Sequence, residues 1–336
     1  MNNALYKSIT TSRGLHYNYY ASPAQSGSPT LFFCHGFPGT ARDWRYIVPF
    51  FKEKGYGIIA PDMIGYGGTD KPADPTQYVS SLVTRDLVDI MDAENVDKAI
   101  AIGHDWGSKT VSRFANYFPD RFVAYAFLAA AYLPPLQPVD FEDFLAFVKG
   151  INGYETYGYW LFFSEEGADQ LIQDHVDSFI SVLYPHDPSL WKTHIGPRGA
   201  LKAALQQDFR SPLPSYMSQE DIDTWKSIFL KNGLAAPLCW YKIMTSGLEP
   251  LDDQKIPKER AFPPKTSPVF FGGASQDFVC NANIGQDVFT SPPFKDHDVT
   301  LTGFDADHWL ILSKPAEICQ KMESWIKTSV AKATTS

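Results

Sequence analysis

Short apolar runs alternate with segments of helical spacing near both ends of the chain. The runs predict buried strands, and they are residues 30–34, 57–60, 98–102, 122–129, 268–271 and 298–301. Apolar positions three and four apart predict helices at residues 44–54, 78–91, 109–117 and 316–327. Alternating polar and apolar positions over residues 6–20 predict a hairpin. This order indicates an α/β fold with a mostly parallel, doubly wound sheet, whose sites lie at the carboxyl ends of its strands.

The alternation stops between residues 133 and 258. This stretch has no convincing core strand, many helix-like segments and a high density of aromatic residues. Prolines cluster at both of its edges, which is typical of boundaries and hinges. We expect a helical cap domain that excludes water and shapes a substrate pocket. The expected division is 1–132 for the first part of the core, 133–258 for the cap and 259–336 for the second part of the core.

The composition is that of an ordinary globular protein, with 44% hydrophobic and 20% charged residues among 336. The net charge of -9 argues against nucleic acid or an anionic membrane surface as a partner. No run of about 18 apolar residues occurs, so no membrane span is expected. The N-terminal residues lack the apolar core of a signal peptide.

Cysteine usage bears on metal binding and location. Cys34, Cys239, Cys280 and Cys319 lie far apart and form no C-x-x-C pair. Their spacing predicts neither a zinc site nor a disulfide framework. A reduced, cytoplasmic protein fits best. The sequence leaves the oligomeric state open, and a homodimer is one of the options.

Residues 102–108, Ile-Gly-His-Asp-Trp-Gly-Ser, join an expected strand to an expected helix. Gly103 and Gly107 have the spacing of the G-x-S-x-G nucleophile elbow, but Asp105 stands where the serine would be. A carboxylate there attacks a saturated carbon directly, giving an enzyme ester that water cleaves. Taken alone, the motif favours the plainer interpretation of Asp105 as the N-cap of the helix.

A second loop, His-Gly-Phe-Pro-Gly at residues 35–39, directly follows the first core strand. Its glycines allow the backbone to approach a ligand, although the same string also suits a strand-ending turn. The backbone N–H groups of Phe37 and Trp106 are candidates for an oxyanion hole. Phe37–Pro38 is a candidate cis peptide. The glycine-rich loop at residues 61–70 lacks G-K-[ST], so it does not predict a nucleotide site.

Two further candidates follow the last two expected strands. Asp277 lies just beyond residues 268–271, and His308 lies in a loop before the final helix. Each residue alone is more often an ordinary turn or loop residue. The chain order of Asp105, Asp277 and His308, however, is the order of α/β-hydrolase triads. We expect Asp277 to orient His308, and His308 to activate water.

Four motifs together resemble those of the soluble-type epoxide hydrolases of the α/β-hydrolase fold superfamily, over about residues 5–328. They are His35-Gly36-Phe37-Pro38, Gly103-His104-Asp105-Trp106-Gly107, Ser275-Gln276-Asp277-Phe278-Val279 and Asp307-His308-Trp309. The resemblance implies hydrolysis of an epoxide to a vicinal diol through an ester on Asp105, without a metal or an organic cofactor. The aromatic cap suggests an apolar or aryl epoxide. We expect His35, Pro38, Phe163 and Trp309 to line the substrate pocket.

The resemblance also implies two cap tyrosines whose hydroxyls hold the epoxide oxygen. One belongs to an N-W-Y-[RK] string, which Cys239-Trp240-Tyr241-Lys242 matches with cysteine in place of asparagine. That departure keeps Tyr241 but changes the hydrogen bonds next to it. The other precedes a Phe and a short acidic turn, which selects Tyr159, with Tyr157 as the alternative.

Other classes share parts of this pattern. Haloalkane and fluoroacetate dehalogenases resemble it in framework, but they place a halide donor where Phe37 stands or an Arg after the nucleophile, and the chain has neither. An epoxide leaves as an alkoxide that needs a proton, so two tyrosines favour the epoxide. Non-catalytic binding proteins use the same fold, but all three triad residues are present. No G-x-S-x-G occurs in an elbow context, which argues against a serine hydrolase.

Overall fold

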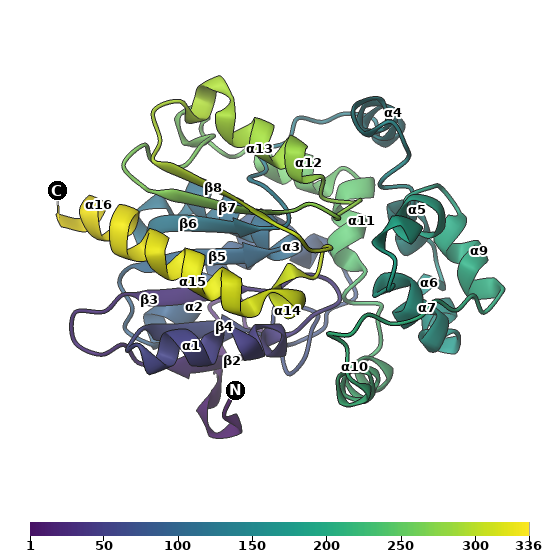
Figure 1. Cartoon of the computed structure of the whole chain (residues 1–336), viewed down its shortest axis with the longest axis horizontal. Coiled ribbons are helices and arrows are strands. Elements are labelled where there is room, and N and C mark those ends of the chain that lie inside the picture. The colour runs from purple at the N-terminus through teal and green to yellow at the C-terminus, as the bar shows by residue number, and fades with distance from the viewer. Residues whose placement is uncertain (336) are drawn as a thin grey trace.

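The computed structural model describes residues 1–335 and contains one eight-stranded sheet with the order β1-β2-β4-β3-β5-β6-β7-β8 (Figure 1). Strands β3 to β8 pair in parallel, whereas β2 pairs antiparallel with both β1 and β4. The predicted α/β fold with a mostly parallel sheet is confirmed. The strands are β1 (Tyr6–Thr10), β2 (His16–Ser22), β3 (Thr30–Cys34), β4 (Gly57–Pro61), β5 (Ala99–His104), β6 (Phe122–Leu128), β7 (Val269–Ala274) and β8 (Val299–Phe304).

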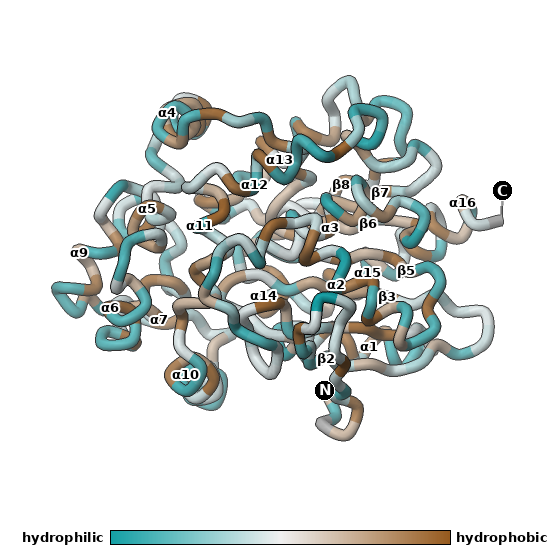
Figure 2. The backbone as a smooth tube through the Cα atoms, turned by 180° about the vertical axis from the view of Figure 1, so that it is seen from behind, coloured by the Kyte–Doolittle hydropathy of each residue, from teal (hydrophilic) through white to brown (hydrophobic). Residues whose placement is uncertain are grey.

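Helices cover both faces of the sheet, which explains the continuous apolar runs of its inner strands. Every residue of β3, β4, β5 and β7 is buried, as expected for parallel strands between two helical layers. Helices α1 and α15 lie on one face, and α2 and α3 lie on the other (Figures 1 and 2). The helices of this part are α1 (Val48–Glu53), α2 (Ser80–Ala93), α3 (Trp106–Tyr117), α13 (Ala282–Thr290), α14 (Leu310–Ser313), α15 (Pro315–Trp325) and α16 (Ala331–Thr335).

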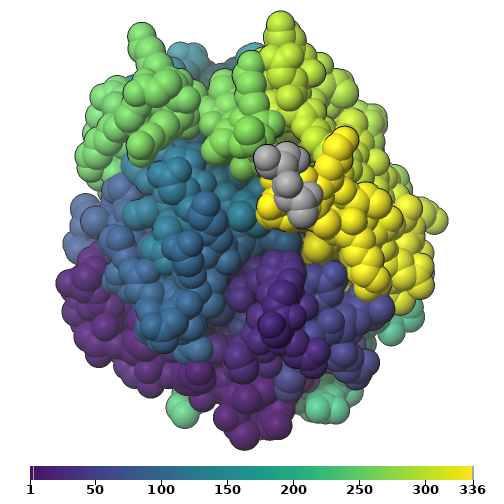
Figure 3. Space-filling model, turned by 90° about the vertical axis from the view of Figure 1, so that its left-hand side faces the viewer, coloured from purple at the N-terminus to yellow at the C-terminus, as the bar shows by residue number. Residues whose placement is uncertain are grey.

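The chain between β6 and β7 is helical and, over its described residues, adds no strand to the sheet. Figure 1 shows these helices gathered at one end of the sheet, whereas Figure 3, seen from the opposite end, shows the first and last parts of the chain side by side. None of the helices within residues 1–335 is long and apolar enough to cross a membrane. The helices between β6 and β7 are α4 (Phe141–Asn152), α5 (Tyr159–Ser164), α6 (Ala168–Asp174), α7 (Val176–Leu183), α8 (Trp191–His194), α9 (Ala200–Gln206), α10 (Gln219–Asn232), α11 (Cys239–Thr245) and α12 (Leu248–Asp253).

A buried cluster of charges attaches this helical segment to α3. Lys109 Nζ lies 2.8 Å from Glu249 Oε1. Arg113 donates from Nε and Nη2 to the two carboxylate oxygens of Asp253, at 2.7 and 2.5 Å. The same guanidinium donates to the Leu133 carbonyl at 2.6 Å. Because Leu133 follows β6 and Asp253 ends α12, one side chain holds both ends of the segment.

The replacement Asp253→Ala is expected to lower the free energy of unfolding by about 3 to 5 kcal/mol, because it leaves the buried Arg113 charge without its bidentate partner. Denaturant unfolding measures this loss. The matched control is Asp296→Ala, which removes an exposed pair with Lys265 and is expected to cost less than about 1 kcal/mol. Equal effects of the two replacements would contradict this account of the cluster.

Candidate active site

Asp105 occupies a strained turn between β5 and α3. Its backbone adopts φ 54° and ψ -123°, a region of backbone conformation that residues other than glycine rarely adopt. The turn is tightly packed: a Cβ on Gly103 would lie 2.4 Å from the Gly107 carbonyl oxygen, and one on Gly107 would lie 2.0 Å from the Cys34 carbonyl oxygen. The Asp105 side chain makes no capping hydrogen bond to α3. The geometry is therefore that of a nucleophile elbow, and the N-cap interpretation does not hold.

The structure brings together the three side chains of the predicted triad. His308 Nε2 lies 3.5 Å from Asp105 Oδ2, and His308 Nδ1 lies 2.6 Å from Asp277 Oδ2. The other oxygen of Asp277 accepts hydrogen bonds from the backbone N–H groups of Val279 at 2.9 Å and Cys280 at 2.8 Å. Asp277 is therefore held from both sides, and its hydrogen bond orients the imidazole toward Asp105.

Charge and burial set the protonation of this site. Burial opposes the ionised forms, but the charge of Asp277 and the hydrogen bonds with Asp105 and Asp277 raise the pKa of His308 well above its ordinary value. Burial likewise opposes ionisation of Asp105, but hydrogen bonding to His308 and the charge of that imidazole lower the carboxyl pKa. Both shifts favour an Asp105 carboxylate beside a His308 imidazolium in the resting site.

One cluster in the described chain has the donor types and closeness of a metal site. The ligand atoms of Asp277, Cys280 and His308 lie within 4.8 Å of one another. However, Asp277 and His308 are already hydrogen-bonded to each other at 2.6 Å. The two atoms that would bind a metal, His308 Nδ1 and Asp277 Oδ2, are therefore already used in the hydrogen bond of the triad.

The loop after β3 presents its backbone to the nucleophile. The Phe37 N–H donates to Asp105 Oδ1 at 2.8 Å. A Cβ on Gly36 would lie 2.3 Å from the same oxygen, so the close approach requires glycine. Trp106 is the first residue of α3, and its N–H has no acceptor within the helix. The Phe37–Pro38 peptide is cis, as the sequence suggested.

Two tyrosines of the helical segment, Tyr159 on α5 and Tyr241 on α11, meet in front of Asp105. Their ring centroids lie 5.8 Å apart, and both rings line a cavity with Asp105. Tyr157, the alternative to Tyr159, donates its hydroxyl to the Val279 carbonyl at 3.2 Å. The geometry therefore favours the pair Tyr159 and Tyr241.

Both tyrosine hydroxyls stay protonated at neutral pH. Burial, followed by the Asp105 charge, raises the pKa of Tyr159 well above its ordinary value. Burial, followed by the neighbouring Tyr159 and Asp105, does the same for Tyr241. Two phenol O–H groups close to one carboxylate can therefore donate hydrogen bonds, and a proton, to a ligand oxygen.

Two of the four expected pocket residues lie elsewhere. Phe163 and Trp309 line the cavity at Asp105, but His35 and Pro38 line neither cavity that reaches this carboxylate. The His35 ring accepts from the Met63 N–H at 2.9 Å and donates to the Gly36 carbonyl at 2.8 Å. Burial lowers the pKa of His35 to about 4. The imidazole is therefore neutral, and its two hydrogen bonds hold the loop after β3 in place. This corrects the expectation for His35 and Pro38.

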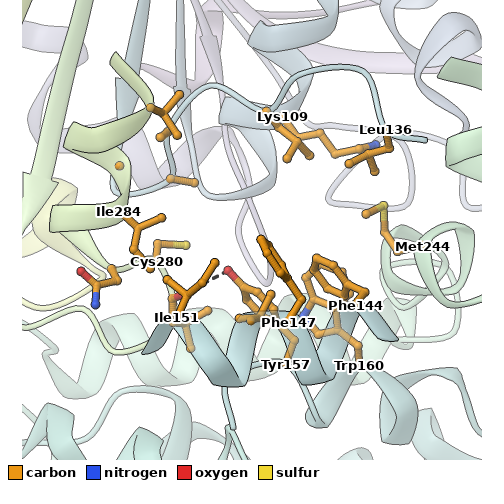
Figure 4. Close-up of a pocket in the computed structure, with 18 of the residues that line it drawn as sticks. Lys109, Leu136, Phe144, Phe147, Ile151, Tyr157, Trp160, Met244, Cys280 and Ile284 are labelled. Carbon is orange, nitrogen blue, oxygen red and sulfur yellow. Dashed lines mark hydrogen bonds between the residues drawn. The ribbon is translucent and has the colours of Figure 1, made fainter. Parts of the chain in front are cut away.

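Asp105 borders two cavities of unequal size. The larger, about 370 Å³, lies against α4 and is lined mainly by apolar side chains (Figure 4). The smaller, about 20 Å³, lies beside His308. Sequence reasoning missed two residues here. Cys280 lines the larger cavity, and its position three residues after Asp277 was the available signal. Trp191 lies 5.3 Å from the His308 ring, and no motif marks it.

Comparison with known proteins agrees with this geometry. A family described as "alpha/beta hydrolase fold" matches residues 29–158, which include the loop after β3 and the elbow. The chain has the α/β-hydrolase fold. Among solved structures, this hydrolase-fold chain resembles an epoxide hydrolase A from Mycobacterium thermoresistibile, with a TM-score of 0.77 at 24% identity over 96% of this chain and 98% of the other. That likeness concerns the fold.

Several curated relatives of this chain are named epoxide hydrolases. The chain is 27% identical to "Epoxide hydrolase 2" of Siraitia grosvenorii, over 92% of this chain and 95% of that protein. It is 28% identical to "Epoxide hydrolase A" of Mycobacterium tuberculosis, over 88% and 89%. It is 25% identical to mouse "Bifunctional epoxide hydrolase 2" over 90% of this chain but 52% of the mouse protein. The chain thus spans about half the length of its mammalian relatives, and the predicted resemblance to epoxide hydrolases is confirmed.

Proposed function

We propose that the protein is an epoxide hydrolase that converts an apolar epoxide and water to a vicinal diol. The observation that carries the proposal is the meeting of an elbow carboxylate, Asp105, with two tyrosines, Tyr159 and Tyr241, on one cavity. A carboxylate supplies the nucleophile for a saturated carbon, and phenols supply the proton that an alkoxide leaving group needs. The names of the relatives support the same activity. The helices between β6 and β7 act as the cap domain.

In the first step, Asp105 attacks one ring carbon through Oδ2, because Oδ1 is held by the Phe37 N–H. The ring C–O bond breaks, and its oxygen takes a proton from Tyr159 or Tyr241. The product is a hydroxyalkyl ester on Asp105. Ring strain assists the opening, and the sequence of steps requires no metal or organic cofactor.

In the second step, His308 removes a proton from water, and the hydroxide attacks the Asp105 ester carbon. Ester formation has consumed the negative charge of Asp105, which had favoured the imidazolium form of His308. Its pKa then falls, and the imidazolium returns its proton to the tyrosinate that ring opening left behind. The neutral imidazole, still oriented by Asp277, becomes the base. The oxyanion at Oδ1 accepts from the N–H groups of Phe37 and Trp106. Collapse of this intermediate breaks the ester C–O bond, and the departing alkoxide takes the proton of the newly formed carboxyl group. This gives the diol and restores the Asp105 carboxylate beside the His308 imidazolium.

The replacements Tyr159→Phe and Tyr241→Phe are each expected to lower the rate of ester formation by about 10²-fold, with a larger loss in the double variant, because each removes a proton donor. Single-turnover kinetics with an apolar epoxide measures this rate. Tyr157→Phe is the matched control, since its hydroxyl donates to the Val279 carbonyl. A loss in Tyr157→Phe as large as that in Tyr159→Phe would reverse the assignment of the two residues.

The four cysteines are free, which supports our proposal of a reducing, cytoplasmic environment.

A dehalogenase would use the same triad but would not need phenol donors. We therefore favour the epoxide over a carbon–halogen bond as the substrate.

A further inference from the structure

The two cavities that meet at Asp105 differ in volume by more than tenfold. The larger holds about 370 Å³ and the smaller about 20 Å³. About 10 to 15 Å³ of such volume is needed for one water molecule, so the smaller cavity has room for roughly one group of that size. The larger is in the range of small-molecule sites. Substituents on the two ring carbons of an epoxide would therefore meet very different surroundings.

The walls of the smaller cavity are packed and fixed. Ile195, Leu201 and Phe163 line it, and all three are buried. Trp191 closes it beside His308, and its indole N–H is fixed by a hydrogen bond to the Val182 carbonyl at 3.0 Å. An alkyl chain on this side would have to displace close-packed side chains, which is unfavourable.

The larger cavity offers a long, apolar space without an unpaired charge. Apart from Asp105, Lys109 is its one charged lining residue among those described. The Lys109 ammonium is satisfied by Glu249 at 2.8 Å and by the Ser80 hydroxyl at 2.9 Å. Figure 4 shows Lys109 beside Leu136, across the open space from the aromatic side chains of α4 and α5. The substituent that fits here is large, apolar and uncharged.

We propose that the substrates are epoxides substituted on one ring carbon only, with one large uncharged apolar arm. The arm occupies the larger cavity. The unsubstituted ring carbon faces the smaller cavity and is the carbon that Asp105 attacks. Ile195 and Leu201 are then specificity-determining residues, because they exclude a second substituent. This inference rests on the proposed function and narrows it to one substrate class.

Two positional isomers test the inference, 1,2-epoxydecane and trans-5,6-epoxydecane, because they share composition and differ in where the ring sits. Wild-type enzyme is expected to favour the terminal isomer in kcat/KM by about 100-fold or more, since a few methylenes in a closed pocket change selectivity by this order. The double variant Ile195→Ala/Leu201→Ala opens the smaller cavity. It is expected to raise the internal-to-terminal ratio of kcat/KM at least about tenfold.

The matched control is Leu205→Ala. It removes the same atoms as Leu201→Ala and lies on the same helix, α9, but at a buried position that lines neither cavity. Its internal-to-terminal ratio is expected to equal that of the wild type. An unchanged ratio in the double variant, or a wild-type enzyme that hydrolyses both isomers at similar rates, would overturn the inference but leave the proposed activity intact. Failure of the wild type to hydrolyse any epoxide would instead remove the proposed function.

A second variant tests the larger cavity and does not depend on folding of the first. Ile284→Trp places a bulky ring in the space that Ile284 lines (Figure 4). It is expected to lower the ratio of kcat/KM for 1,2-epoxydecane to that for 1,2-epoxypropane by at least about tenfold, since the three-carbon substrate needs no long arm. An equal effect on both substrates would place the arm elsewhere and contradict the inference.

Discussion

Replacing Asp105 with alanine is expected to abolish epoxide hydrolysis, lowering kcat by about 10⁴-fold or more, as for removal of other catalytic nucleophiles. Asp105 is the carboxylate that the elbow presents to the cavity between Tyr159 and Tyr241. Without it, no covalent ester forms, and His308 loses the carboxylate 3.5 Å from its Nε2. Diol formation from 1,2-epoxydecane, followed over hours, measures the residual rate.

A folding control is needed because Asp105 is a partly buried residue in a strained turn. The variant should melt cooperatively, and its melting temperature should not lie more than a few degrees below that of the wild type, since the replacement removes a partly buried charge. A folded variant that keeps more than about one-hundredth of the wild-type rate would contradict nucleophilic attack by Asp105. It would instead indicate direct attack of water on the ring.

Replacing His308 with glutamine is expected to stop the reaction after its first step. Glutamine keeps much of the side-chain volume but cannot remove a proton from water at neutral pH. Asp105 retains the Phe37 N–H and both tyrosines, so ring opening still occurs and the ester accumulates. Intact mass spectrometry should show a gain equal to the mass of one whole epoxide. Peptide mapping should place this gain on the peptide that carries Asp105.

The same variant separates the two chemistries that an elbow aspartate can perform. Exposure to a matched bromoalkane should leave it unmodified, whereas an adduct lighter than the reagent by hydrogen bromide would indicate a dehalogenase. The double variant Asp105→Ala/His308→Gln is the control, and it should gain no mass from either reagent. Wild-type turnover by His308→Gln would contradict the second step.

Sequence reasoning succeeded where the constraint is local or follows from strand order. Gly103 and Gly107 are needed because any Cβ there would overlap backbone atoms. Their spacing around Asp105 therefore predicts the turn from seven consecutive residues. Asp277 and His308 each follow a strand of a parallel sheet, and neighbouring strands β7 and β8 bring them together. The rule that parallel strands end at the same edge of a sheet therefore predicted that Asp277 and His308 lie close together.

The remaining features depend on packing between distant segments. His35 belongs to the motif around Phe37, yet its ring turns away from the cavity to meet Met63. Tyr157 and Tyr159 are two residues apart, and which hydroxyl faces Asp105 is decided by the contact of Tyr157 with Val279. The unequal cavities depend on α8 and α9, which carry no motif. No local pattern encodes these choices.

The attachment of the helical segment to α3 also bears on how such proteins diversify. Arg113 holds the chain where it leaves the sheet at Leu133 and where it returns at Asp253. The chain between these points can change in length and shape while the two anchor points stay in place, provided that Tyr159 and Tyr241 still reach the cavity at Asp105. Changes in the helices that line the two cavities can therefore alter which substituents fit, without rebuilding the sheet that carries Asp105, Asp277 and His308.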